Sequence, residues 1–191
     1  RSERIGEITV SSTVESSPND DWMLPKEAFG WITTNIGAGE IIVEFGSGHG
    51  SIELSKHYTL TSVEHNKNWL NISQGNYIFS EITPNPISTK SGQLGWYQID
   101  ILKQNLPPKP CLIIIDGPPG SIGRHGVLNL IDYLSTAKFI LVDDIDREAE
   151  SDLLESIHSQ LKCQISTNIS SKTRSNGTVR KFAILKMEGL V

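Results

Sequence analysis

Short apolar segments alternate with amphipathic segments along most of the chain. The most apolar ones predict strands at 41–43, 111–115 and 138–142. The second and third of these show no alternation of apolar and polar residues, which is typical of strands buried on both faces of a parallel sheet. Apolar residues at helical spacing predict helices at 25–36, 67–75, 127–134 and 146–161. The pattern therefore predicts an α/β fold, doubly wound, with a mostly parallel sheet and helices on both faces.

The alternation of strand and helix stops near the C-terminus. Two β-like runs, 164–171 and 178–187, are joined by a segment containing Asn176-Gly177, a dipeptide typical of tight hairpin turns. These runs predict a C-terminal antiparallel hairpin. Farther upstream, 95–101 predicts the third strand of the sheet. The stretch 76–93, with Pro84 and Pro86, predicts an irregular connection with or without a short strand.

The length and the ends of the chain set its expected organisation. With 191 residues, the chain is long enough for one domain with a sizeable core. Residues 1–21 are rich in Ser, Glu and Asn with little periodicity, and we expect them to form an N-terminal arm that is either flexible or packed at an edge of the domain. Residues 22–191 are expected to form a single Rossmann-like domain.

A glycine-rich turn follows the first predicted strand, and an acid ends the second. Gly46, Gly48 and Gly50 form the turn, and Glu64 ends the strand that follows the intervening helix. Glycine lets the backbone turn sharply and lets a ligand approach the amides. In a doubly wound sheet, an acid at the position of Glu64 binds the hydroxyls of a ribose. The stretch 41–64 therefore predicts a nucleotide-type site.

The spacing of the glycines indicates which kind of nucleotide ligand the turn binds. The turn reads G-x-G-x-G rather than the G-x-G-x-x-G of dinucleotide sites, and Glu44 precedes it. An acid suits a ligand with an ammonium and a sulfonium better than a pyrophosphate. The sequence E-F-G-S-G-H-G-S, followed by V-E-H, resembles the first two motifs of class I S-adenosylmethionine-dependent methyltransferases.

This resemblance implies a cofactor, a sheet order and a set of cofactor residues. The sheet would have seven strands in the order 3-2-1-4-5-7-6. Trp69 would stack on adenine or pack a helix onto the sheet, and Asp100, expected at a strand end, would bind the adenine amine or form a turn. The residues implied for S-adenosylmethionine are Glu44, Phe45, Gly46, Ser47, Gly48, His49, Gly50, Ser51, Glu64, His65, Trp69, Asp100 and Asp116.

Three acids end the fourth and fifth predicted strands. Asp116 follows 111–115, and Asp143 and Asp144 follow 138–142. If these strands are neighbours, the carboxylates lie close together and repel each other unless a proton or a cation intervenes. Oxygen ligands suit Mg²⁺ or another hard divalent cation. The placement is similar to metal-dependent catechol-type and macrolide-sugar O-methyltransferases, which implies catalytic roles for Asp116 and Asp143. Without a metal, Asp116 would contact the substrate and Asp144 or Asp146 would cap the next helix.

A looser resemblance covers about a third of the chain. IDGPPGSIGRHG resembles the loop of the glucuronoxylan O-methyltransferase family, which favours a sugar hydroxyl as the acceptor. Arg124 would then bind a substrate carboxylate, and His125 would be a substrate-side catalytic residue that accepts a proton. The alternative is that both lie in a solvent-exposed glycine loop and have no role in catalysis.

Composition limits the partners. A net charge of -5 and a pI near 5.5 argue against a nucleic-acid surface. No apolar run is long enough for a membrane span. Two cysteines form no disulfide framework, which favours a reducing, cytoplasmic compartment. We expect a small-molecule or carbohydrate acceptor, and the sequence leaves the oligomeric state open, a dimer being compatible with it.

The sequence therefore predicts an S-adenosylmethionine-dependent O-methyltransferase, with a divalent cation as a further expected cofactor. Two alternatives remain open at this point. An NAD(P)-dependent oxidoreductase would share the sheet and the ribose acid. A methyltransferase-like domain without catalytic activity would share the whole pattern.

Overall fold

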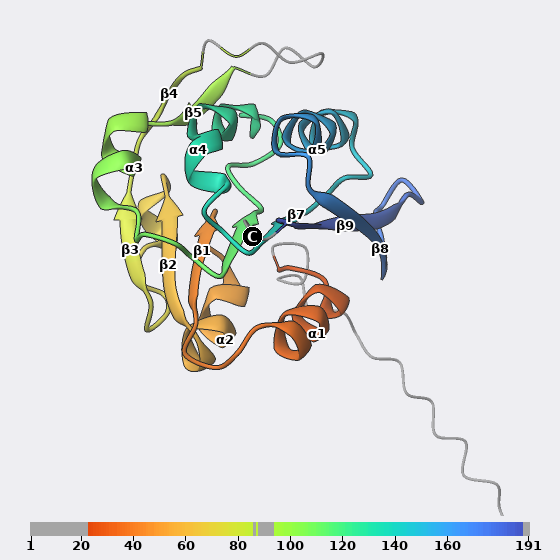
Figure 1. The fold of residues 1–191 in the computed structure, drawn as a ribbon, viewed down its shortest axis with the longest axis horizontal. Coiled ribbons are helices and arrows are strands. Elements are labelled where there is room, and N and C mark those ends of the chain that lie inside the picture. Colours follow the sequence, from red (N-terminus) through yellow and green to blue (C-terminus); the bar gives the residue numbers. More distant parts are fainter. Residues whose placement is uncertain (1–22, 86, 88–93, 189–191) are drawn as a thin grey trace, which may run out of the picture.

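A sheet of seven strands lies at the centre of the structure, a computed structural model (Figure 1). In sheet order the strands are β3 (Asn76–Phe79), β2 (Thr59–Glu64), β1 (Ile41–Phe45), β6 (Leu112–Ile115), β7 (Phe139–Val142), β9 (Val179–Lys186) and β8 (Gln164–Thr173). The first five are parallel, whereas β9 runs antiparallel to both β7 and β8. Counted along the chain, this is the predicted order 3-2-1-4-5-7-6, so the expected fold class is confirmed.

The structure describes residues 23–85, 87 and 94–188. The expected arm, residues 1–21, lies outside the described residues. The described residues contain no helix long and apolar enough to cross a bilayer.

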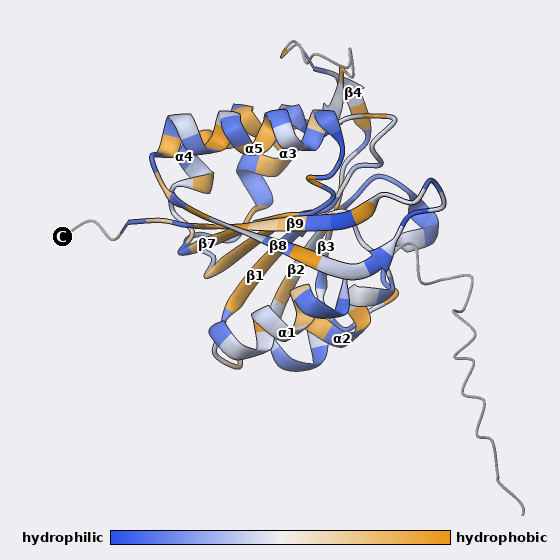
Figure 2. Ribbon diagram, turned by 90° about the vertical axis from the view of Figure 1, so that its right-hand side faces the viewer, coloured by the Kyte–Doolittle hydropathy of each residue, from blue (hydrophilic) through white to orange (hydrophobic). Residues whose placement is uncertain are grey.

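Helices cover both faces of the sheet (Figure 2). One face carries α1 (Lys26–Asn35) and α2 (His49–His57), and the other carries α3 (Ile99–Asn105), α4 (Ile131–Leu134) and α5 (Glu148–Leu161). The predicted helix at 127–134 is in fact a 3₁₀ segment, η3 (His125–Leu130), continued by α4.

Alternate residues of each central strand face different helical layers. In β6, Ile113 and Ile115 join one apolar cluster, and Leu112 and Ile114 join the other, all four with no exposed surface. Full burial of such a side chain contributes about 1.5–3 kcal/mol to the free energy of folding. The unbroken apolar run therefore forms a central strand, as predicted.

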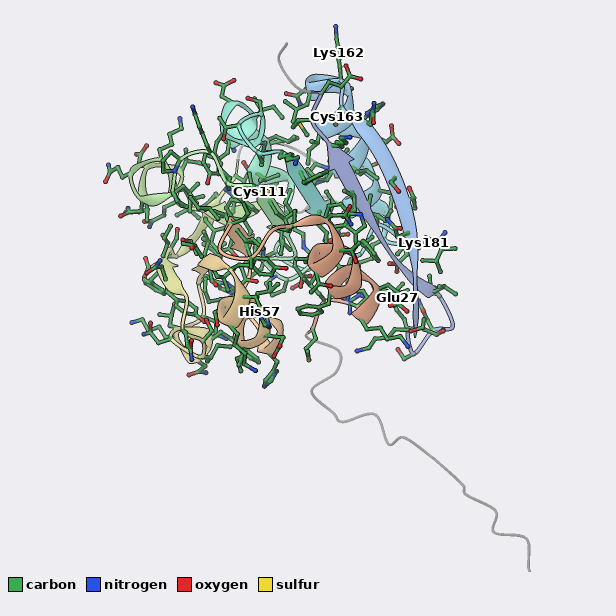
Figure 3. All side chains as sticks on the ribbon, turned by 60° about the horizontal axis from the view of Figure 1, so that its bottom comes forward. Glu27, His57, Cys111, Lys162, Cys163 and Lys181 are labelled. Atoms are coloured by element: carbon green, nitrogen blue, oxygen red, sulfur yellow. The ribbon has the colours of Figure 1, made fainter. Side chains whose placement is uncertain are left out.

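The C-terminal hairpin forms at the predicted place. Gly177 has φ +83°, and the Asn176 side chain accepts a hydrogen bond from the amide of Thr178 at 3.0 Å. Helix α1 packs against the hairpin, where Glu27 accepts a hydrogen bond from the amide of Ser171 at 2.9 Å (Figure 3). The hairpin is thereby tied to the start of the described chain.

Two expected elements are wrong. The third strand of the sheet is β3, which lies within the stretch expected to be irregular. The prediction missed it because this edge strand is short and buries only Ile78. The segment expected as that strand instead gives β5 (Gly95–Tyr97), which pairs with β4 (Ile82–Pro84) in a separate two-stranded sheet, and then α3. The helix expected at 67–75 is only the 3₁₀ turn η2 (Lys67–Trp69).

Both cysteines are free thiols (Figure 3). Cys163 is buried and Cys111 is partly exposed. This agrees with the expectation that they form no disulfide framework.

Candidate cofactor and acceptor site

The glycine turn lies between β1 and α2, as expected. Gly46 has φ +92°, in the region that favours glycine. A Cβ added to Gly46 would lie 2.8 Å from the Cα of Gly117, in the loop after β6. The two loops therefore touch through their backbones, and neither position has room for a side chain.

Glu64 ends β2 and faces this turn. Its carboxylate accepts hydrogen bonds from the amides of Ser47 at 2.9 Å, His65 at 2.8 Å and Asn66 at 2.6 Å. A carboxylate offers about four lone-pair positions, so at least one remains for a ligand hydroxyl. Glu64 thus both shapes the turn and keeps capacity for a ribose.

Glu44 is buried and lies apart from the cavity lining. Its carboxylate accepts hydrogen bonds from the hydroxyls of Ser62, at 2.5 Å, and of Ser51 in the first turn of α2. Burial raises its pKa to about 7, although both serine hydrogen bonds act in the opposite direction. Glu44 therefore holds the start of α2 against β2, and this position does not support direct contact with a ligand ammonium.

A cavity of about 660 Å³ opens at the carboxyl ends of the strands. This volume lies within the range of small-molecule sites. One side is formed by the turn and the segment after β2, through Gly46, Ser47, Glu64, His65, Asn66 and Trp69. The other side is formed by the loop after β6, the start of α5 and the tip of the hairpin, including Asp116, Pro118, Arg124, Asp144, Arg147 and Arg174. The cavity can therefore hold a nucleoside on one side and a second molecule on the other.

Several residues expected at the cofactor lie behind the cavity wall. Phe45 is fully buried and packs on Trp96, with ring centroids 5.3 Å apart. Gly50 lies against the ring of Phe29, and His49 contacts the Trp69 ring edge-on at 5.2 Å. These residues support the turn, as do Gly48 and Ser51, joined by a hydrogen bond of 3.1 Å.

Asp100 is not at a strand end. It is exposed in the first turn of α3 and is not among the residues that line the cavity. The expectation failed because the strand before it ends at Tyr97, and the helix begins at Ile99. The structure gives no support for its contact with adenine.

The three acids at the ends of β6 and β7 come together as predicted. One carboxylate oxygen from each of Asp116, Asp143 and Asp144 lies within 4.8 Å of the others. Asp143 and Asp144 are buried, whereas the Asp116 side chain is 24% exposed and faces the cavity.

Arginines surround this acidic cluster. Arg180 pairs with Asp143 and, through Nε at 3.1 Å, with Asp144. Arg124 lies 3.1 Å from Asp144 and 3.5 Å from Asp116. Asp144 also receives Arg174 Nη2 at 2.6 Å and Arg147 Nη1 at 3.1 Å. Each Asp144 oxygen thus contacts two guanidinium groups. Arginine side chains therefore supply the positive charge that offsets the repulsion between the acids.

These contacts do not fit a Mg²⁺ ion bound by all three carboxylates. A cation at Asp144 would have to replace guanidinium contacts on whichever oxygen it used, and Mg²⁺ requires near-ideal octahedral geometry. The convergence of the acids was therefore predicted correctly, and of the two ways considered for relieving their repulsion, a proton or a cation, the arginine contacts do not favour the cation.

Asp144 and Asp116 have pKa values shifted in opposite directions by their surroundings. Although burial acts in the opposite direction, the charges of Arg124, Arg180 and Arg147 lower the pKa of Asp144 to about 2. Burial, together with the charge of Asp143, raises the pKa of Asp116 well above its usual value, and Arg124 only partly offsets this. A carboxyl with a raised pKa at the cavity wall is suited to accept a proton from a bound hydroxyl.

Several solved structures with the same architecture are methyltransferases. An O-methyltransferase from Bacillus cereus, in complex with S-adenosylhomocysteine, superposes with a TM-score of 0.58 at 12% identity, over 91% of this chain and 83% of that one. A precorrin-6Y C5,15-methyltransferase from Geobacter metallireducens gives 0.55 at 13% identity, over 89% and 96%. The chain has the class I methyltransferase fold. A putative tRNA (m1A22) methyltransferase from Streptococcus pneumoniae gives 0.51 at 12% identity, over 88% and 73%.

Comparison of the sequence alone identifies no related family or protein. No protein-family model matches the chain, and no curated protein sequence matches it. The class I methyltransferase fold is therefore established by the structure, and the acceptors of the three neighbours differ too widely to indicate the acceptor of this chain.

Within this methyltransferase fold, Arg124 lines the cavity, as expected for a residue on the substrate side, whereas His125 does not. Arg124 is buried, and its Nε donates to the carbonyl oxygen of Pro118 at 3.1 Å, so it fixes the loop that carries Asp116. His125 is the buried first residue of η3, is not among the cavity-lining residues, and has a pKa lowered by burial. The structure therefore supports a positioning role for Arg124 and gives no support to catalysis or substrate binding by His125.

Sequence reasoning missed the arginine partners. Arg147 lies three residues after Asp144, a spacing at which an ion pair can form, and Arg174 and Arg180 flank the Asn176-Gly177 turn. The predicted hairpin already places Arg174 and Arg180 near its tip. Their contact with the acids depends on how the hairpin docks on β7, which the sequence alone does not specify.

Proposed function

We propose that this protein transfers a methyl group from S-adenosylmethionine to a hydroxyl oxygen of a polar small molecule or sugar. The observation that carries the proposal is a single cavity with Glu64 and the glycine turn on one side and Asp116 on the other. A ribose acid and a proton acceptor in one cavity are what methyl transfer to a hydroxyl requires.

The cofactor side would be held by Glu64 and the turn. Glu64 would bind the ribose, and Gly46 and Ser47 would let the rest of the ligand pass close to the backbone. His65, Asn66 and Trp69 would line the nucleoside end. When bound, S-adenosylmethionine supplies a methyl group on a positively charged sulfur, which makes that group susceptible to attack by oxygen.

The acceptor side is polar. Among the described lining residues beyond the cofactor side, Pro118 and Pro119 are the only apolar side chains, and none is aromatic. Flat aromatic ligands bind in sites lined mainly by apolar and aromatic side chains. The lining therefore favours a sugar or another polyhydroxy acceptor over a catechol-like ring.

Asp116 is the proposed general base. Its carboxylate takes the proton from the acceptor hydroxyl while that oxygen forms its bond to the methyl carbon and the carbon–sulfur bond breaks. Arg124 holds the loop of Asp116 in place. The proton then passes from Asp116 to water, and the products are a methyl ether and S-adenosylhomocysteine.

Mg²⁺ is proposed to have no part in this reaction. Because arginines already contact Asp143 and Asp144, we expect no binding heat when Mg²⁺ is titrated into the protein, and equal transfer rates with and without a chelator. Saturable Mg²⁺ binding that the Asp143→Asn substitution removes would contradict this and restore the metal site that the sequence indicated.

Binding of S-adenosylhomocysteine tests the cofactor side directly. Calorimetry on the wild type should detect binding, and Glu64→Ala should weaken it about 100-fold, because a charged hydrogen bond and the anchor of three loop amides are both lost. Glu53→Ala, on the exposed surface of α2, is the matched control and should bind as the wild type does. Absence of binding to the wild type, or no loss on Glu64→Ala, would refute the proposal.

Two further measurements separate the alternatives. A fluorescence titration with NADH should show no binding, since the turn lacks the third fingerprint glycine. A panel of sugars, phenols and amines with radiolabelled S-adenosylmethionine identifies the acceptor class. Bound cofactor without transfer to any member would indicate a domain without catalytic activity.

A further inference from the structure

A second cavity lies beside the acceptor side of the first. It has a volume of about 460 Å³ and lies between the loop after β6 and the start of α5. Pro119, Gly120 and Arg147 line both cavities. The two cavities therefore adjoin at this loop and at Arg147.

Glu150 gives the second cavity a buried and incompletely paired acid. The residue lines the cavity, is only 2% exposed, and its Oε1 has no hydrogen-bond partner. The nearest cationic nitrogens, Arg124 Nε at 3.8 Å and Arg147 Nη1 at 3.9 Å, are beyond hydrogen-bond distance. A buried acceptor without a donor costs about 1–3 kcal/mol. Because Oε1 has almost no accessible surface, a ligand that donates a hydrogen bond here recovers part of that energy only by displacing a neighbour such as Arg147.

Gly120 lets the loop pass close to these side chains. A Cβ on Gly120 would lie 2.8 Å from Arg147 Nη1 and 3.5 Å from Glu150 Oε1. The loop that separates the two cavities is therefore narrow at this point, and Arg147, 39% exposed, lies at the boundary.

The chemistry of the second cavity selects among ligands. Its described lining contains two acids, Glu148 and Glu150, and one cation, Arg147, which disfavours a phosphodiester or another anion. Its apolar side chains are only Pro119 and Ala149, which disfavours a hydrophobic ligand. Carboxylates that accept and a guanidinium that donates suit the hydroxyls of a neutral sugar.

We propose that this second cavity binds the sugar unit next to the one that is methylated, so that the acceptor is a neutral oligosaccharide chain. The inference rests on the proposed function and specifies its substrate class. The cavity at Asp116 holds the reacting unit, and the cavity at Glu150 holds its neighbour.

The test compares neutral monosaccharide methyl glycosides with the di- and trisaccharides of the same sugars, using radiolabelled S-adenosylmethionine. We expect kcat/KM to be about tenfold higher for the oligosaccharide, which corresponds to one additional net hydrogen bond. Ser121 lines the second cavity at an exposed position, so Ser121→Phe places an aromatic ring there. This variant should have about the same kcat/KM for the oligosaccharide and the monosaccharide. Ser151→Phe, the same substitution at an exposed position of α5 outside the lining, should keep the advantage of the oligosaccharide.

The outcomes are distinguishable. Equal kcat/KM for monosaccharides and oligosaccharides, or an advantage that survives Ser121→Phe, would overturn the second subsite and leave the proposed function intact. Transfer to no sugar by a protein that binds S-adenosylhomocysteine would overturn the carbohydrate acceptor. Absence of S-adenosylhomocysteine binding would overturn the proposed function itself.

Discussion

The Asp116→Asn variant is expected to transfer methyl groups about 10²–10⁴-fold more slowly than the wild type, the usual contribution of a positioned general base. Asparagine has nearly the same shape but cannot take the proton from the acceptor hydroxyl. Binding of S-adenosylhomocysteine should remain, since Glu64 and the turn are unchanged. Single-turnover transfer to the acceptor found in the panel measures the effect.

The pH dependence provides a second readout for Asp116. Only the deprotonated carboxylate accepts a proton, and burial raises its pKa, so the wild-type rate should rise as the pH rises through this raised pKa and then level off. Asp116→Asn should lose this rise. Asp132→Asn, at an exposed position in the first turn of α4, is the control and should keep both rate and profile. If Asp116→Asn kept more than a tenth of the rate, Asp116 would not be the base.

The Arg180→Met variant is expected to lose about 3–5 kcal/mol of unfolding free energy, the usual cost of removing one partner of a buried ion pair. Asp143 has no exposed surface and would be left without the Arg180 guanidinium. The carbonyl oxygen of Met23 would also lose its donor, now at 3.0 Å. Urea denaturation followed by circular dichroism measures the change.

A neighbouring residue supplies the control for Arg180. Lys181→Met removes a positive charge from an exposed position on the same strand and should change the unfolding free energy by less than about 0.5 kcal/mol. Adding Asp143→Asn to Arg180→Met should restore part of the loss, because no buried charge is then left unpaired. A loss below about 1 kcal/mol for Arg180→Met would show that the pair does not stabilise the fold.

The sheet could be predicted because its central strands carry strong local patterns. The unbroken apolar run of β6 indicates a strand that is buried on both faces. The dipeptide Asn176-Gly177 indicates a tight turn without help from the rest of the chain. The sequence also placed Glu64 and Asp116 at strand ends, and both line the same cavity. These positions follow from strand boundaries, which are local features.

The errors concern features that depend on distant contacts. The edge strand β3 has one buried residue and no clear period, so its pairing with β2 cannot be read from local pattern. The error at Asp100 followed directly from it. Similarly, the sequence shows acids that need positive charge, but only the docked hairpin and the start of α5 bring Arg180, Arg174 and Arg147 to them.

The contact between Gly46 and Gly117 has a consequence for how new specificities could arise. In the proposed function, one loop lies on the donor side and the other on the acceptor side, and they meet main chain against main chain. The spacing of the two loops at this point is then set by main-chain atoms. Side chains around the rim are free to diverge and admit other alcohols, while the point at which the methyl group is delivered stays where it is.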